Sequence, residues 1–334
     1  MASAKIEYVN DDKAIRVAVV GVGAFGRNHA RVFRELAGEQ RVELAAVVDG
    51  DSARAAAAAA EFGTRAYTGV DAMLAAEKPD AAVVAVPTVA HLAVARQLMR
   101  SGVDVMIEKP LAVNLEQADE LIALAKEHER VAQVGHLERF NPAVRATLPI
   151  ITTPMFFEVH RLSVFTPRSL DVDVVLDLMI HDLDVVLSLV KSEVRDLHAA
   201  GLPVLSPNVD IANVRIEFQS GCVANFTASR ISTERVRKLR FFQPYQYVSV
   251  DYSRRDIFTL TVKPTEKGGM PEVVPSKPEV IAEEPLKSEL KSFLRAVRER
   301  ATPEVTLQDG RRALALALEI QRQMVEHAER AHLR

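Results

Sequence analysis

The sequence predicts a doubly wound, parallel α/β sheet, followed by an α+β domain with an open, mainly antiparallel sheet. For the first part, segments typical of strands and helices alternate from residue 14 to about 135, and a glycine-rich turn joins the first pair. For the second, strand-like segments follow one another from about residue 155 with short polar turns between several of them. We therefore expect a polar N-terminal extension (1–13), an α/β domain (14–135), an α+β domain (136–308) and a C-terminal helix that packs back on the domains (309–334).

The first strand and helix are joined by three glycines at the spacing of a dinucleotide site. The apolar run from Ile15 to Val20 predicts a strand buried on both faces, and Gly21-x-Gly23-x-x-Gly26 follows it. Gly21 would permit a tight turn, Gly23 would let the backbone approach a pyrophosphate, and Gly26 would let helix and strand pack closely. Unpaired N–H groups at the helix start would bind the anion, so the first domain is expected to be a Rossmann domain.

A carboxylate at the end of the second strand favours NAD as the cofactor. The strand from Val42 to Val48 ends in Asp49, 23 residues after Gly26. This spacing suits an acid that accepts hydrogen bonds from ribose hydroxyls, although an ordinary solvated aspartate is the alternative. Asp49 and Asp51 would both repel a 2′-phosphate, which predicts NAD rather than NADP.

The remaining elements follow from hydrophobic pattern, caps and breakers. In the α/β domain, helices are expected at 27–36, 51–63, 89–101 and 115–128, and strands at 80–87, 103–107 and 131–134. In the second part, strands are expected at 155–161, 195–200, 211–218, 222–229, 237–242, 247–251 and 256–262, and helices at 174–190, 286–299 and 309–329. Prolines and glycines between 263 and 285 predict a linker or an extended excursion.

Composition is that of a globular protein with no electrostatic reason to bind nucleic acid or a membrane surface. The 334 residues are 48% hydrophobic and 26% charged, and the net charge is −3 with acids and bases interspersed. The polar N-terminus does not resemble a signal peptide, and no apolar stretch is long enough to span a membrane. A single cysteine, Cys222, excludes an internal disulfide and fits a reducing cytoplasm, where we expect the protein to act.

Two places carry residues suited to proton transfer. Ligands bind parallel α/β sheets beyond the carboxyl ends of the strands, where Pro87-Thr88 and Glu108-Lys109-Pro110 lie. Lys109 could donate or accept a proton there, although a surface lysine is an equally simple interpretation. On the helix from residue 174, Asp177 and His181 are one turn apart, so the carboxylate could orient the imidazole as an acid/base pair. An ion-paired surface histidine is the alternative.

A metal site is not expected in this chain. The sequence has no His-Glu-x-x-His motif, no cysteine pair and no other closely spaced histidine ligands.

The order and spacing of these motifs resemble those of the Gfo/Idh/MocA family of pyridine-nucleotide-dependent sugar and polyol oxidoreductases. The matching motifs are Gly21-x-Gly23-x-x-Gly26, Val86-Pro87-Thr88 with His91, Glu108-Lys109-Pro110 and Asp177-x-x-x-His181, and the resemblance covers nearly the whole chain from about residue 14. It implies that Lys109, Asp177 and His181 frame the reacting carbinol, and that the open sheet supports homodimers or homotetramers. The expected cofactor-binding residues are Gly21, Gly23, Ala24, Phe25, Gly26, Asp49, Pro87, Thr88, His91, Glu108 and Lys109.

The second domain is most similar to the nucleotide-sugar branch of this family, in which UDP-N-acetylglucosamine is oxidised at C3. The motifs concerned are Gly135-His136-x-Glu138-Arg139-Phe140-Asn141-Pro142, Met179-Ile180-His181-Asp182-Leu183-Asp184 and Ser229-Arg230. A diphosphate needs cations, and arginine matches phosphate oxygens bidentately. The expected substrate-binding residues are His136, Arg139, Asn141, Arg161, His181 and Arg230, the last leading into Arg235 and Arg237.

Two alternatives remain open at this point. The first is an NAD(P)-dependent dehydrogenase of a free polyol, an inositol or a dihydrodiol. The second is a non-catalytic regulator that uses the same fold to sense a dinucleotide, because fold does not fix function.

Overall fold

The computed structural model describes residues 13–166, 172–263 and 270–332, and its contacts divide the chain into two compact units. The first unit comprises the described residues of Met1–Glu108, Glu120–Gln133 and Leu290–Glu304. The second comprises those of Lys109–Asp119, Val134–Glu289 and Val305–Arg334. The chain therefore passes between the units more often than the predicted boundaries at 135 and 308 allow, and Leu290–Glu304 joins the first unit. Residues 1–12 of the expected polar extension lie outside the described residues.

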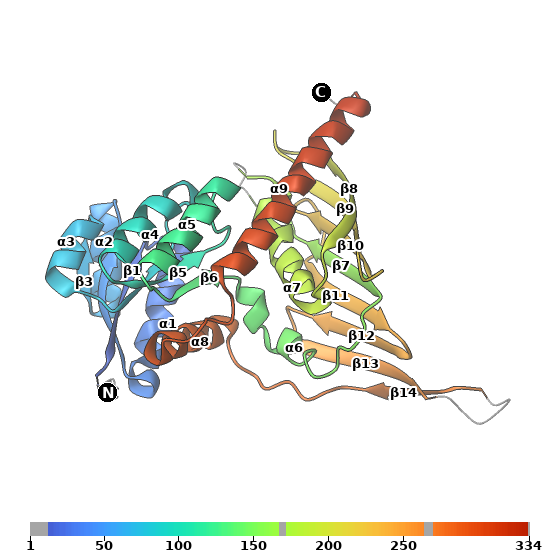
Figure 1. The fold of residues 1–334 in the computed structure, drawn as a ribbon, viewed down its shortest axis with the longest axis horizontal. Coiled ribbons are helices and arrows are strands. Elements are labelled where there is room, and N and C mark those ends of the chain that lie inside the picture. Colours follow the sequence, from blue (N-terminus) through green and yellow to red (C-terminus); the bar gives the residue numbers. More distant parts are fainter. Residues whose placement is uncertain (1–12, 167–171, 264–269, 333–334) are drawn as a thin grey trace, which may run out of the picture. The chain divides into compact units, whose positions relative to one another are not determined.

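The first sheet has six strands in the order β3-β2-β1-β4-β5-β6 (Figure 1). Its strands are β1 (Ile15–Val20), β2 (Val42–Val48), β3 (Arg65–Tyr67), β4 (Ala81–Val84), β5 (Asp104–Glu108) and β6 (Ala132–Gly135). The intervening helices are α1 (Ala24–Gln40), α2 (Ser52–Phe62), α3 (Val70–Glu77), α4 (His91–Arg100) and α5 (Leu115–Glu127). The order reverses between β1 and β4, so the predicted doubly wound parallel sheet is confirmed.

Local sequence explains most of these elements. All four residues of β4 are buried, as a strand covered on both faces requires. Helix α2 begins where the Asp51 carboxylate accepts from the N–H groups of Ala53 and Arg54, and it ends at Gly63 with φ +63°. The sequence did not predict β3 and α3, because a three-residue edge strand has too few residues to show a pattern.

The second sheet has eight strands in the order β14-β13-β12-β11-β7-β10-β9-β8. They are β7 (Phe156–Leu162), β8 (Val194–Leu202), β9 (Ile211–Phe218), β10 (Val223–Ser229), β11 (Val236–Gln243), β12 (Gln246–Asp251), β13 (Asp256–Lys263) and β14 (Glu272–Ser276). Only the central pair, β7 and β10, is parallel among the paired strands described. The predicted open, mainly antiparallel sheet is therefore confirmed.

Strand β14 corrects one expectation, because it lies inside the segment predicted to be a linker or excursion. It pairs with β13, and Pro275 stands opposite Leu260. Proline is tolerated there because β14 is an edge strand, with no further strand to receive an N–H donor.

Helices α7 (Ile180–Val190) and α9 (Leu307–Arg330) cover one face of the second sheet (Figure 1). Their apolar residues join a single core with alternate residues of the strands, such as Val214, Phe226 and Phe241. The remaining helical segments are η1 (Thr88–Ala90), η2 (Leu137–Phe140), α6 (Pro142–Arg145), η3 (Val175–Met179) and α8 (Pro285–Glu299). Among the described residues, no helix has the length and apolar character needed to cross a membrane.

The helix expected over 174–190 is interrupted near its start. Segment η3 is a π-helix of five residues, and regular α-helix begins only with α7 at Ile180. Asp173 precedes this turn, and its Oδ1 accepts from the N–H groups of Val175 at 2.8 Å and Leu176 at 3.1 Å. π-turns of this kind are frequent at functional sites, and this one contains Asp177.

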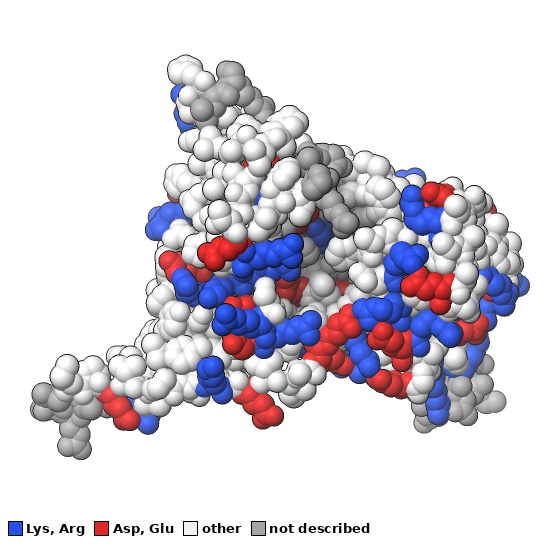
Figure 2. Space-filling view, turned by 180° about the vertical axis from the view of Figure 1, so that it is seen from behind, with Lys and Arg blue, Asp and Glu red and all other residues white. Residues whose placement is uncertain are grey.

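The face opposite to that of Figure 1 carries Lys and Arg side chains interspersed with Asp and Glu side chains (Figure 2). On that face the described residues therefore form no extended patch of one sign, as the interspersed charges of the sequence predict.

Candidate active site

The glycine turn after β1 has the geometry that a dinucleotide requires. Gly21 has φ +89°, and a Cβ built on it would lie 2.6 Å from the Ala85 carbonyl oxygen. A Cβ on Gly26 would lie 1.7 Å from the Gly21 carbonyl oxygen, whereas one on Gly23 would meet no atom within 4 Å. Gly23 is also the N-cap of α1 and offers no side-chain cap, so the open space faces unpaired N–H groups. These residues fit the pyrophosphate of NAD, and Ala24 and Phe25 form the adjoining first turn.

Asp49 lies at the end of β2 and is tied to the glycine turn. Its Oδ2 accepts from the Val22 N–H at 2.9 Å, and its Oδ1 accepts from the Asp51 N–H at 3.0 Å. The Arg54 guanidinium donates to the same carboxylate at 3.2 Å, a contact that the sequence did not predict. The carboxylate is thus held at the position where, in this fold, an acid accepts hydrogen bonds from the ribose hydroxyls.

Two of the expected cofactor-binding side chains have protein partners. His91 is 1% exposed and its Nε2 lies 3.0 Å from the carbonyl oxygen of Val86, the residue before Pro87, which is the N-cap of η1 (Thr88–Ala90). The Glu108 carboxylate lies 2.7 Å from His29 Nε2. Both side chains position the loops after β4 and β5, and a direct contact with the cofactor stays a prediction for them.

Lys109 reaches the backbone of the π-turn. Its Nζ donates to the backbone carbonyl of Asp177 at 2.8 Å, so two of the three predicted catalytic residues are in direct contact. The expected orientation of His181 by the Asp177 carboxylate is wrong for the described residues: no hydrogen bond joins them, and His181 Nδ1 is buried without a partner. The reason is the π-turn, which changes the one-turn spacing that the pairing assumed.

The surroundings of His181 keep its ring neutral. Burial lowers its pKa well below the usual 6.5, and the positive charges of Lys109 and Arg161 lower it further. His136 and Arg237 act on the same ring in the same direction. At pH 7 the imidazole is therefore uncharged, the form that can accept a proton.

Arg161 belongs to a buried ionic cluster that includes Asp182, the residue after His181. Its guanidinium contacts Asp182 at 2.6 and 2.9 Å and Glu138 at 3.1 Å, and it lies over the Tyr252 ring at 5.2 Å. Only 3% of Arg161 is exposed, and the neighbouring carboxylates raise the pKa of the arginine against the effect of burial. The expectation that Arg161 binds a substrate phosphate is therefore not supported, because its guanidinium nitrogens already donate hydrogen bonds to two carboxylates.

The other two predicted arginines also face acids. The Arg139 guanidinium lies 3.6 Å from both Asp184 and Asp309. Arg230 is 5% exposed; it donates to the Val172 carbonyl at 2.5 Å and lies 3.7 Å from Asp210. Binding of substrate by these arginines would require them to leave these partners.

Asn141 and His136 are both buried in the second unit, and their binding of substrate stays a prediction. The Asn141 amide donates to Glu138 at 3.0 Å and to the Tyr252 carbonyl at 3.1 Å, and its Oδ1 caps α6 by accepting from Ala143. His136 is 1% exposed and interacts with the buried Asp184 and with His181. Both residues belong to the second unit with His181, and the Asn141 side chain is hydrogen-bonded to other residues of the protein.

The sequence analysis named Glu138 and Asp182 only within motifs, and it did not predict that they surround Arg161 together with Tyr252. A signal was present in the strand β7, where Arg161 continues the buried alternation of Phe157 and Val159. A charged residue at a core-facing strand position indicates a buried ionic partner.

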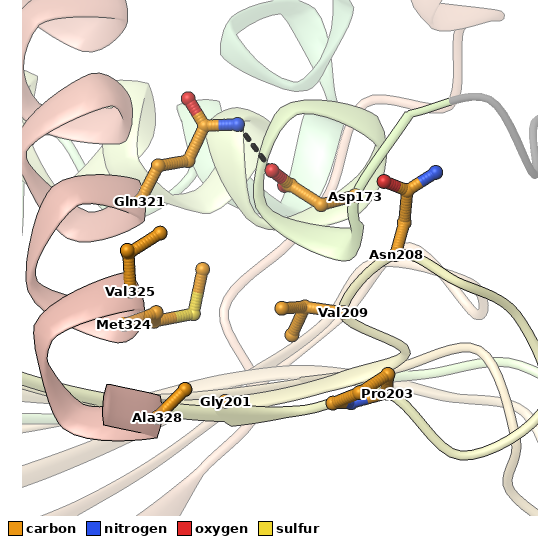
Figure 3. Close-up of a pocket in the computed structure, with 9 residues that line it drawn as sticks. All are labelled: Asp173, Gly201, Pro203, Asn208, Val209, Gln321, Met324, Val325 and Ala328. Carbon is orange, nitrogen blue, oxygen red and sulfur yellow. Dashed lines mark hydrogen bonds between the residues drawn. The ribbon is translucent and has the colours of Figure 1, made fainter. Parts of the chain in front are cut away.

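A separate pocket lies between α9 and the β8–β9 connection (Figure 3). Asp173 and Gln321 point toward each other across it and form a hydrogen bond, while Met324 and Val209 supply apolar walls. Both carboxylate oxygens of Asp173 already accept hydrogen bonds, one from Gln321 and the other from the N–H groups at the start of η3. The Asp173–Gln321 bond therefore connects α9 to the start of the π-turn.

Comparison with known families decides the class of protein. Residues 15–136 match the model of the Gfo/Idh/MocA oxidoreductase family with its NAD-binding Rossmann fold, and residues 155–242 match the Gfo/Idh/MocA C-terminal domain. The chain belongs to the Gfo/Idh/MocA family. It is thus an oxidoreductase that uses NAD and a small-molecule substrate, and the regulatory alternative is not retained.

Individual Gfo/Idh/MocA relatives differ in substrate. The UDP-N-acetylglucosamine 3-dehydrogenase of Acidithiobacillus ferrooxidans is 36% identical over 92% of this chain and 96% of its own length. A solved structure of that enzyme covers 93% of this chain and 97% of its own, with a TM-score of 0.87. The NAD-dependent scyllo-inositol 2-dehydrogenase of Bacillus subtilis is 28% identical over 65% of this chain and 68% of its own length.

Proposed function

We propose that this chain is an NAD-dependent dehydrogenase that oxidises the C3 hydroxyl of UDP-N-acetylglucosamine or a related nucleotide sugar. One observation carries the reaction type: Lys109 Nζ is fixed on the Asp177 carbonyl in the same cluster of charges as a neutral His181. The substrate class rests on the 36% identity to a UDP-N-acetylglucosamine 3-dehydrogenase over nearly the whole of both chains.

In this proposal the protein moves the proton of the reacting hydroxyl. NAD, when bound on the glycine turn and Asp49, supplies the acceptor for the hydride of the carbinol carbon. Neutral His181 takes the hydroxyl proton, since an uncharged imidazole is a competent base near pH 7. Lys109 donates a hydrogen bond to the carbinol oxygen and stabilises the negative charge that develops there.

A substrate screen tests the proposal directly. NADH absorbance is followed with UDP-N-acetylglucosamine, free N-acetylglucosamine, myo-inositol and scyllo-inositol at equal concentrations. The molecular masses of the products are then measured by mass spectrometry. We expect the nucleotide sugar to react fastest and to yield a product lighter by the two hydrogen atoms removed. Faster reduction of NAD with an inositol would overturn the proposal and favour the polyol alternative, which the scyllo-inositol 2-dehydrogenase relative suggests.

We further propose a cytoplasmic homodimer or homotetramer that associates through the open face of the second sheet. Phe156, Phe242 and Tyr247 lie side by side on that face, with ring centroids 5.8 and 5.1 Å apart, and Phe242 is 38% exposed. Adjacent aromatic rings on an uncovered sheet face are typical of a protein interface. The single, buried Cys222 supports a reducing compartment.

A further inference from the structure

Arg237 occupies a distinctive place at one end of the second sheet. It stands opposite Arg161 in the antiparallel pair of β11 and β7. Both side chains belong to the helix-covered face, because Leu239 and Phe241 follow Arg237 at alternate positions and are buried. Arg161 in turn contacts Asp182, the residue after His181, so Arg237 lies at the edge of the cluster around His181.

Arg237 differs from Arg139, Arg161 and Arg230, because no carboxylate pairs with it among the described residues. Arg139, Arg161 and Arg230 all have an acid within 4 Å, whereas no ion pair is formed by Arg237 among residues 13–166, 172–263 and 270–332. Its side chain is exposed, so an incoming ligand can reach it. Arg237 is thus a solvent-accessible cation, near His181, that could bind an anionic ligand.

The local charge balance favours an anion at this position. The carboxylates of Asp182 and Glu138 both pair with Arg161, His181 is neutral, and Arg237 forms no ion pair within the described part of the chain. Although the side chain is open to solvent, desolvation by its neighbours and the nearby Arg161 charge lower the pKa of Arg237, and the charges of Glu138 and Asp182 offset this only in part. A bound phosphate would relieve both effects.

We infer that Arg237 binds the substrate's anionic group, a phosphate of the diphosphate in a nucleotide sugar. The planar guanidinium can donate two parallel hydrogen bonds to phosphate oxygens. An uncharged polyol would leave this cation without a counter-charge. The inference rests on the proposed function and adds to it the residue that distinguishes nucleotide sugars from free sugars.

The test compares Arg237→Met with a matched control, Arg195→Met, whose side chain is 65% exposed on β8. KM and kcat are measured with UDP-N-acetylglucosamine, binding of UDP alone by calorimetry, and binding of NADH by fluorescence. We expect Arg237→Met to raise the KM for the nucleotide sugar and weaken UDP binding about 10- to 100-fold, the effect of losing a charge-assisted hydrogen bond. The control should change neither value, and NADH binding should stay within twofold in both variants.

The outcomes separate this inference from the proposed function. If the wild-type protein oxidises UDP-N-acetylglucosamine but Arg237→Met keeps KM and UDP affinity within twofold, the inference alone is overturned. If the wild-type protein neither oxidises the nucleotide sugar nor binds UDP, both fall together. Should Arg237→Met fail to fold, Arg237→Gln decides, since it keeps a polar side chain of moderate length without the charge and must show the same loss.

Discussion

At the scale of single residues, the roles of charged side chains in this protein are set by their partners. Arg161 and Arg237 stand opposite each other in the sheet. Arg161 forms ion pairs with two carboxylates, whereas Arg237 forms none among the described residues. His181 is a base candidate because burial and nearby cations remove its charge. Residue type alone does not distinguish a structural arginine from a ligand-binding one.

Lys109 should be needed for turnover but not for cofactor binding. We expect Lys109→Met to lower kcat about 10²- to 10⁴-fold, because it removes a hydrogen-bond donor at the reacting oxygen. NADH affinity, measured by fluorescence, should stay nearly unchanged, since the glycine turn and Asp49 belong to the other unit. Normal turnover in the variant would exclude Lys109 from the mechanism.

The pH dependence of His181 provides a second test at this scale. Its folded pKa lies below its unfolded value, so the neutral ring contributes stability above about pH 6.5 that is lost as the pH falls. Turnover should accordingly stay level from neutral pH down to about 6.5 and decline only in more acidic buffer. Lys109→Met should raise the pKa of His181 while leaving it below 6.5, because burial, the largest cause, remains. NMR titration of labelled histidine measures this, and a wild-type pKa at or above 6.5 would contradict it.

Asp49 should determine cofactor preference. Asp49→Ser removes a carboxylate that would accept from the ribose hydroxyls, at a cost of about 1.5–3 kcal/mol, so NAD affinity should fall roughly ten- to a hundredfold. The advantage of NAD over NADP should narrow as well, because Arg54 would lose one of its two acidic partners and keep only Asp51, so its guanidinium could approach a 2′-phosphate. Parallel kinetics with both cofactors would reveal this, and a wild-type preference for NADP would be incompatible with the assignment.

At the scale of elements, the π-turn η3 organises the predicted catalytic residues. It contains the Asp177 carbonyl that fixes Lys109, and His181 follows on the first turn of α7. Asp173 begins the turn, and its hydrogen bond to Gln321 connects the turn to α9 (Figure 3). The conformation of this short segment therefore depends on a residue four positions before Asp177.

Removal of the cap should separate stability from activity. Asp173→Ala should reduce the free energy of unfolding by about 0.5–2 kcal/mol, as loss of a helix cap does, and should also lower kcat. Asp251→Ala is the matched control, because its carboxylate accepts from two N–H groups in a turn at 3.0 Å without contacting His181 or Lys109. Urea denaturation and steady-state kinetics would show similar destabilisation in both variants but a fall in kcat only in Asp173→Ala. An equal effect on kcat would show that the π-turn has no special role.

At the scale of the whole molecule, the chain builds two units whose sequences interleave. The boundary falls between Glu108 and Lys109, so the expected cofactor residue Glu108 and the expected catalytic residue Lys109 are consecutive but belong to different units. The second unit keeps one face of its sheet for α7 and α9, and leaves the aromatic residues of the other face available for association.

That open face predicts the oligomeric state. Phe242→Glu places a charge between Phe156 and Tyr247 and should convert a wild-type dimer into monomers, because burying an unpaired charge is costly. Tyr245→Glu is the control, since Tyr245 is 69% exposed in the turn beside this face. Light scattering coupled to size exclusion gives the mass of each. A monomeric wild type, or a Phe242→Glu variant that stays dimeric, would contradict the proposed interface.

The sequence by itself determined both sheets, the glycine turn, Asp49 and the order of motifs that places the chain in its family. These features depend on local patterns: apolar runs, glycines at fixed spacing and an acid after a strand. The sheet order, the π-turn and the edge strand β14 were decided by tertiary structure, because they depend on which segments meet. The same holds for the arginines: cross-strand register and helix packing bring Asp182 and Glu138 to Arg161 and leave Arg237 without an acid among the described residues. A side chain's partners come from distant parts of the chain, so no local pattern could assign which arginine is available for a phosphate.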